Sequence, residues 1–192
     1  MLENEQIEFN LTFAHSYEFE YERDFPGNMS DNWYYYPGGE SVGGKDGLLV
    51  KVRLKEGHVW HGLFSFGHFQ QGCPSGIFTT PKDDCLCVVA KGKGYFVSTT
   101  NPCSWEGVMA NPILNSFAIA SKGILVFADF NRLIAYGQSG LKWRTVRLGS
   151  DGLNITEVTD HYIKGNFWDS ARQRKGMFEV NLDTGNDDWK SA

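Results

Sequence analysis

The sequence predicts an all-β protein built from antiparallel sheets, and three observations lead to this prediction. Apolar and polar residues alternate with a period of two along most of the chain, no segment carries a helical stripe of apolar residues, and 22 glycines recur at short intervals. The 192 residues, of which 41% are hydrophobic, can bury a core without disulfide or metal support. Only the segments 104–109 and 169–174 could hold a helical turn.

The N-terminal region predicts two strands followed by a long loop. Apolar residues alternate with polar ones over 7–13, and aromatic residues alternate with Glu18 and Glu20 over 17–21, so the two segments are expected to pair as an antiparallel hairpin. The segment 27–47 contains Pro-Gly and Gly-Gly turn sequences and is expected to be a loop that encloses four consecutive aromatic residues.

Short apolar or alternating segments, separated by glycine-bearing turns, follow along the rest of the chain. They predict strands at 48–54, 59–66, 86–90, 95–99, 117–120, 124–128, 132–136, 141–148, 153–158, 162–167 and 177–182. Many short strands with glycine turns are typical of a β-sandwich, a barrel or a propeller-like array of hairpins.

Two stretches of the C-terminal half resemble one another. The segment 124–143 holds a strand, a tight turn, a second strand, a Ser-Gly turn and then a tryptophan, and the segment 178–189 repeats the end of this pattern. Gly140 and Gly185 lie 45 positions apart, which suits a repeat of four strands, and glycine allows the positive φ that such a turn requires.

This pattern resembles the blades of quinoprotein-type β-propellers, over roughly residues 85–190. The resemblance implies stacked four-stranded sheets, and the chain has enough residues for three or four of them, which gives a partial propeller. It also implies that Trp143 and Trp189 are equivalent and that each is buried between two sheets. The quinone and calcium sites of the enzymes in that family have no counterpart in this sequence, so no cofactor is expected.

Charge is distributed unevenly along what is expected to be a single domain, residues 1–192. Residues 1–40 hold nine acidic residues and one basic residue, which leaves 14 acidic and 17 basic residues of the totals of 23 and 18 for the remainder. The region 1–46 is therefore expected to be an acidic, aromatic-rich hairpin and loop, and 47–192 a β-sheet body. The acidic region either lies across the basic body of its own molecule or docks a basic partner.

The aromatic cluster in the N-terminal loop is the leading candidate for a binding site. Four consecutive aromatic side chains cannot all face inward, and exposed Trp and Tyr are frequent at protein interfaces and stack on sugars. Together with the alternating carboxylates of the preceding strand, they make up the predicted binding residues Trp33, Tyr34, Tyr35, Tyr36, Glu18, Glu20 and Glu22. The alternative is a loop that these rings hold against the protein's own body.

Histidine and cysteine side chains are the candidate metal ligands, because zinc takes three or four of them. The weak candidates for such a site are His58, His61, His68 and Cys73. Their spacing matches no common zinc pattern, and His58 and His61 would face opposite sides of one strand. The alternative is surface histidines and partly buried free thiols. Cys85 and Cys87 would share one face of a strand and fill the core.

No catalytic residue is predicted, because the sequence lacks a nucleophile elbow, a phosphate-binding loop and carboxylates paired across separate elements. The net charge of −5 argues against a nucleic-acid partner. No apolar run approaches about 20 residues and the acidic N-terminus does not resemble a signal peptide, so a soluble, cytoplasmic protein with no membrane partner is expected.

The sequence therefore predicts a non-enzymatic protein-binding module, such as a bacterial immunity-type protein or another inhibitor, whose acidic and aromatic surface binds a protein partner and favours a basic one. One alternative is a small metal-binding protein or enzyme that uses His58, His61, His68 and Cys73. The other is a carbohydrate-binding β domain that uses the aromatic cluster at 33–36.

Overall fold

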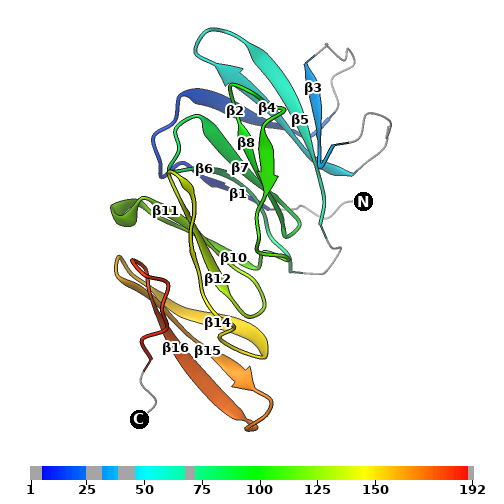
Figure 1. Ribbon diagram of the computed structural model, residues 1–192. Helices are drawn as coiled ribbons and strands as arrows, with labels where there is room; N and C mark the ends of the chain where they lie inside the picture. The colour runs from blue at the N-terminus through cyan, green and yellow to red at the C-terminus, as the bar shows by residue number, and fades with distance from the viewer. Residues whose placement is uncertain (1–5, 25–31, 39–45, 68–71, 190–192) are drawn as a thin grey trace.

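The computed structural model describes residues 6–24, 32–38, 46–67 and 72–189, which form four β-sheets stacked one on the next (Figure 1). The prediction of an all-β protein with antiparallel sheets is confirmed, and in the described part no sheet closes into a barrel. The helical structure of these residues is limited to one 3-10 turn, Ala120–Lys122. None of the described segments forms a helix long and apolar enough to cross a membrane.

Two sheets form the N-terminal half of the stack. Sheet 1 has the strand order β2-β4-β5-β3, and sheet 2 has the order β1-β6-β7-β8-β9. Their strands are β1 Ile7–Asn10, β2 Tyr17–Glu22, β3 Trp33–Tyr36, β4 Gly47–Leu54, β5 Val59–Ser65, β6 Ser75–Thr79, β7 Cys85–Ala90, β8 Lys93–Ser98 and β9 Trp105–Gly107. The pairs β1–β6 and β3–β5 are parallel, and the other pairs of these two sheets are antiparallel.

Two antiparallel sheets form the C-terminal half. Sheet 3 has the order β10-β11-β12-β13, and sheet 4 has the order β14-β15-β16. Their strands are β10 Asn115–Ile119, β11 Ile124–Ala128, β12 Leu133–Gly137, β13 Gly140–Arg144, β14 Asp151–Val158, β15 Tyr162–Asp169 and β16 Arg174–Asn181. Each sheet of this half is thus a simple meander in which strands adjacent in the chain pair with one another.

Three hydrophobic cores lie between the four sheets, one at each junction. The strand β7 of sheet 2 contributes to two of these cores. Its residues Leu86 and Val88 pack in the core shared with sheet 1. Its residues Cys87 and Val89 pack in the core shared with sheet 3. Side chains alternate across a strand, so a sheet buried on both faces needs an unbroken apolar run. This explains why β7 and β11 are apolar throughout.

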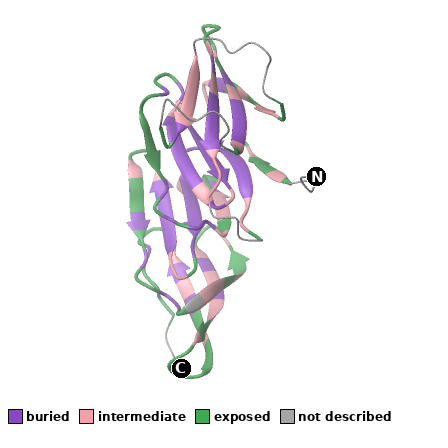
Figure 2. Ribbon diagram, turned by 90° about the vertical axis from the view of Figure 1, so that its right-hand side faces the viewer, coloured by how far each residue is buried: buried purple, intermediate pink, exposed green. Residues whose placement is uncertain are grey.

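Sheets 1 and 4 end the described stack, and each has one face away from the cores. Figure 2 shows buried residues concentrated in the middle of the stack, whereas exposed residues increase toward the C-terminal sheet. The outer faces of these two sheets carry polar and aromatic side chains in alternation with core residues. The end sheets are therefore the places where the fold presents a broad strand surface outward.

The predicted hairpin between 7–13 and 17–21 is wrong, because the two segments belong to different sheets. β1 adds in parallel to the edge of sheet 2, with Ile7 opposite Ser75, whereas β2 pairs with β4 in sheet 1. The connecting residues hold no tight turn. They bond instead to sheet 2, where the Phe13 amide donates to the Thr79 hydroxyl at 3.0 Å.

Three strands were not predicted, namely β3, β6 and β9, and neither suspected helical turn is present. β6 begins with Ser-Gly and is buried on both faces, so it shows no alternation. β9 has only three residues and lies inside the segment 104–109. The segment 169–174 contains the end of β15, a turn and the start of β16.

The two tryptophans of the suspected repeat occupy different environments. Trp143 is 8% exposed, lies in the core between sheets 3 and 4, and donates from Nε1 to the Leu182 carbonyl at 2.8 Å. Trp189 is 38% exposed, so the expectation that both tryptophans are buried between sheets is wrong for this one. Gly140 and Gly185 both have the expected positive φ, at 98° and 73°.

Candidate functional site

The outer face of sheet 1 brings together most of the predicted binding residues. On β2, Tyr17 and its alternate neighbours pack in the core, so Glu18, Glu20 and Glu22 point to the opposite face. On β3, Tyr34 and Tyr36 pack in the same core, so the intervening aromatic side chains point outward. We call the outward set the acidic–aromatic face: Glu18, Glu20, Glu22, Trp33 and Tyr35.

Strand register places these side chains in rows across the sheet. Glu20 is opposite Lys51, Lys51 is opposite His61, and His61 is opposite Trp33. The next row runs from Glu22 to Tyr35 through Leu49 and Leu63, which are both buried. Adjacent strands are about 4.8 Å apart, so each row of four strands spans about 14 Å.

Polar and ring contacts hold the centre of this face together. Glu22 Oε2 lies 3.5 Å from His61 Nε2, and Glu22 Oε1 lies 3.8 Å from Lys51 Nζ. The His61 ring stacks on Trp33 with the centroids 4.8 Å apart and the planes at 11°. This arrangement fixes the Trp33 indole on the sheet, which lowers the conformational entropy that it would lose on binding.

The acidic side chains differ in how far the protein's own bases engage them. Glu18 and Glu20 are exposed, and within the described residues neither is part of an ion pair, although Arg53 and Lys51 lie opposite them on β4. Glu22 is half-buried and contacts Lys51 and His61. The interpretation that the acidic region lies on the protein's own basic groups therefore holds for Glu22, whereas two carboxylates stay open to another molecule.

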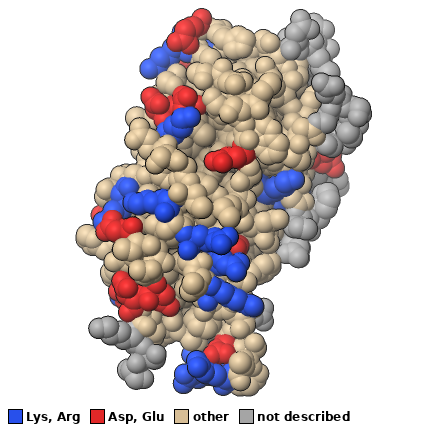
Figure 3. All heavy atoms as spheres, viewed as in Figure 1, with Lys and Arg blue, Asp and Glu red and all other residues tan. Residues whose placement is uncertain are grey.

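Figure 3 shows the wider distribution of charge on one side of the molecule. On the visible face, Lys and Arg side chains gather across the middle and lower part of the molecule with clusters of acidic side chains among them, while much of the upper part is uncharged.

The aromatic cluster at 33–36 is a strand, which corrects the prediction of a loop there. β3 pairs in parallel with β5, so its side chains alternate between the core and the outer face. Tyr36 is 2% exposed, stacks on Phe64 at 4.6 Å and donates its hydroxyl to the Pro102 carbonyl at 2.8 Å. Burial raises the pKa of Tyr36, which keeps the hydroxyl protonated. Tyr34 packs edge-on against Trp60, so only Trp33 and Tyr35 of the four can contribute to an outer binding surface.

The candidate metal ligands do not form a cluster in the described residues. His58 lies exposed in the turn between β4 and β5, His61 lies on the acidic–aromatic face, and Cys73 is half-buried beside Gly92 of the β7–β8 turn. Within the described part, no three His, Cys, Asp or Glu side chains converge as a metal would require. His68 lies outside the described residues, so the metal hypothesis that includes it stays a prediction.

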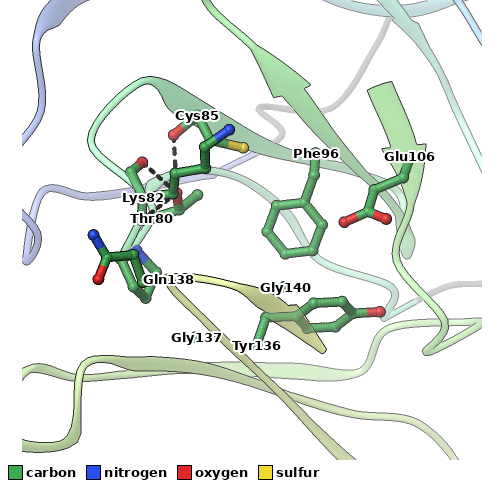
Figure 4. A pocket seen from close by; sticks show the side chains of 10 residues that line it. Thr80, Lys82, Cys85, Phe96, Glu106, Tyr136, Gly137, Gln138 and Gly140 are labelled. Carbon is green, nitrogen blue, oxygen red and sulfur yellow. Dashed lines mark hydrogen bonds between the residues drawn. The ribbon is translucent and has the colours of Figure 1, made fainter. Parts of the chain in front are cut away.

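A small pocket of about 50 Å³ opens between sheets 2 and 3 (Figure 4). Phe96 and Tyr136 form one wall with their ring centroids 4.6 Å apart, and the Thr80 hydroxyl bonds to the Lys82 and Cys85 carbonyls on the other side. Burial raises the pKa of the Cys85 thiol to about 11, so this sulfur is protonated at neutral pH. The described residues that line the pocket include no histidine to activate it. Cys85 and Cys87 share one face of β7 and pack in the core, as predicted.

A groove beside β2 was not foreseen from the sequence. It has a volume of about 370 Å³ and is lined by Phe9 and Leu11 from the β1 side and by residues of β2, including Phe19 and Tyr21. The signal was present, because Phe9 and Leu11 continue the apolar alternation of 7–13, but that alternation was assigned to a buried hairpin.

No protein-family model matches the chain, and a search of curated proteins finds no similar sequence.

Proposed function

We propose that this protein is a non-enzymatic protein-binding module that docks a partner, preferentially a basic one, through its acidic–aromatic face. One observation carries the proposal. Segments that are separate in the sequence, β2 and β3, place their carboxylates and outward rings on the same face of an end sheet.

The chemistry of this face supports an interface. Trp and Tyr bury a large area with few rotatable bonds and are frequent among the residues that dominate binding energy. Glu18 and Glu20 carry charge that can attract a basic surface and orient the encounter. An inhibitor that neutralises a basic enzyme, such as a bacterial immunity-type protein, would need a surface of this composition.

Affinity capture with face variants tests the proposal. The wild-type chain is immobilised and retained proteins are identified at about 50 and 200 mM salt. Glu18→Gln with Glu20→Gln should weaken retention of a basic partner at least tenfold at low salt, since two attractive charges are removed without changing shape. Glu106→Gln, which removes an exposed carboxylate from β9 on sheet 2, is the matched control and should have no effect. Equal retention by all variants, or no retained partner, would refute the proposal.

We also propose that the four stacked sheets correspond to blades of an incomplete propeller. The support is a contact that recurs at two junctions. Trp60 of sheet 1 donates from Nε1 to the carbonyl of Thr99, which directly follows β8 of sheet 2, at 2.9 Å, and Trp143 of sheet 3 donates to the carbonyl of Leu182, which directly follows β16 of sheet 4, at 2.8 Å. Equivalent positions predict that Trp→Phe causes a similar loss of stability at both sites, which denaturant unfolding would measure.

A further inference from the structure

Sheet 2 projects one strand beyond sheet 1 and forms a shelf. Within the described residues sheet 2 has five strands and sheet 1 has four. Trp105 of β9 packs against Tyr36 of β3 at one side, whereas at the other side Phe9 of β1 lies beside Phe19 of the edge strand β2, so β1 is the strand that extends beyond sheet 1. Ile7 packs against the core between the two sheets, but Phe9, which points the same way, is 53% exposed. Among the described residues, the Phe9 ring stacks at its side on Phe19, with the centroids 6.5 Å apart and the planes at 14°.

The groove above this shelf is bordered by the edge of a sheet. In the described part β2 pairs with β4 alone, so its second edge presents backbone N–H and C=O groups that no strand engages. All four residues from Glu18 to Tyr21 line the groove. The side chains of Phe19 and Tyr21 point toward the shelf, whereas those of Glu18 and Glu20 point to the outer face. A free edge next to an apolar shelf is the geometry that accepts an added strand.

We propose that the β2 edge binds an extended segment of a partner protein in which apolar residues alternate with Lys or Arg. The inference rests on the proposed protein-binding function and specifies how the partner docks. As a fifth strand of sheet 1, the segment would cover Phe9 with its apolar side chains. Its basic side chains would lie beside Glu18 and Glu20 as cross-strand pairs of opposite charge.

The charges on this face favour a basic segment over a second copy of the chain. Symmetric pairing of two β2 edges about Glu20 would set Glu20 opposite Glu20 and Glu18 opposite Glu22, and like charges directly opposite are destabilising. On β4, Arg53 and Lys51 already lie opposite Glu18 and Glu20 of β2. A basic segment on the other edge of β2 would place a second set of positive charges beside the same two carboxylates. Glu22 contributes less because Lys51 and His61 already contact it.

Peptide binding tests the docking mode directly. The probe is a fluorescent seven-residue peptide of alternating lysine and valine with blocked ends, titrated with the whole chain at about 50 mM salt and followed by anisotropy. Two further peptides are methylated on backbone nitrogens, one at every valine and the other at every lysine. Because successive N–H groups of an extended strand point to opposite edges, each peptide has one edge blocked, and both keep the charged lysine side chains. We expect saturable binding of the first peptide, at least a tenfold loss for one of the methylated peptides, and no binding of a Glu–Val peptide.

Protein variants locate the bound peptide on the molecule. Phe9→Ala should weaken binding about fivefold or more, while Trp168→Ala, which removes a 42%-exposed ring from sheet 4, should leave it unchanged. The proposal is overturned if the peptide does not bind, if both methylated peptides bind as well as the first, or if Phe9→Ala has no effect. These results test only docking at the β2 edge. If capture of a partner protein were lost in a Trp33 variant but kept in Phe9→Ala, the edge-docking mode would be wrong and the proposed protein-binding function would still hold.

Discussion

Replacing Gly185 by alanine should destabilise the protein mainly through a clash with Trp143. Gly185 has a φ of 73°, and a Cβ at this position would lie 2.8 Å from Cγ and Cδ2 of the indole and 2.9 Å from its Cβ. The indole has little freedom to move away, because it is 8% exposed and its Nε1 donates to the Leu182 carbonyl at 2.8 Å.

The cost can be divided into two parts. A left-handed backbone costs a non-glycine residue about 1–2 kcal/mol, and overpacking in a core costs about 1–3 kcal/mol, which gives about 2–5 kcal/mol for Gly185→Ala. Gly152→Ala is the matched control, because Gly152 has a φ of 75° and an added Cβ would meet no atom within 4 Å. It should cost only about 1–2 kcal/mol.

A double-mutant cycle with Trp143→Ala isolates the clash. Trp143→Ala alone should cost about 3–5 kcal/mol; it removes Cγ and Cδ2 but keeps the Cβ that an added Gly185 Cβ would meet at 2.9 Å. In its presence Gly185→Ala should therefore cost less than in the wild type, with a coupling energy of about 1–2 kcal/mol. Urea unfolding followed by circular dichroism measures all four free energies. A clash with Trp143 would be contradicted if Gly185→Ala cost no more than Gly152→Ala, or if its cost were the same with and without the indole.

Four further predictions concern stability, thiol reactivity and pH dependence. Trp189→Ala should cost less than about 1 kcal/mol in a urea melt, because the side chain is 38% exposed, and a loss above about 3 kcal/mol would show that it is packed after all. Trp60→Phe should cost about 1–3 kcal/mol, since it leaves the buried Thr99 carbonyl without the indole N–H, and an unchanged midpoint would contradict this. Cys103 is exposed and should react first with a thiol reagent, whereas Cys85 should react only on unfolding. Because burial raises the pKa of Cys85 from 9.0 to about 11, the stability that it contributes should be complete below pH 9 and decline as the pH rises toward 11, which melts at successive pH values would detect.

The sequence predicted the strands more accurately than it predicted their pairing. The strand β11 has the predicted bounds, 124–128, because an apolar run between two glycine turns is a strong local signal. The parallel pairing of β1 with β6 has no local signal, since all four described strands of sheet 1 lie between them in the sequence. β6 itself was missed because burial on both faces removes the alternation by which strands are recognised.

In the candidate site too, the direction of side chains within one strand could be predicted from the sequence, whereas features that depend on strand pairing could not. Alternation alone indicated that Glu18, Glu20 and Glu22 share a face. It could not indicate that Trp33 and Tyr35 share that face, because this depends on the parallel pairing of β3 with β5. The loop signals at 27–47 also concealed a strand whose aromatic residues favour β structure.

The place of β1 in sheet 2 has a consequence for the order in which a growing chain can fold. β1 leaves the ribosome first, but the strand that it joins follows much later, and the bond from the Thr79 hydroxyl to the Asn10 carbonyl links residues 69 positions apart. Residues 17–65 contain every strand of sheet 1, so that sheet can form while β1 is still unpaired. Its inner face, with Val50 and Trp60, then has no sheet 2 to cover it. A nascent chain that ends before β6 would therefore expose this apolar face, and this is the stage of synthesis at which a chaperone would have most to protect.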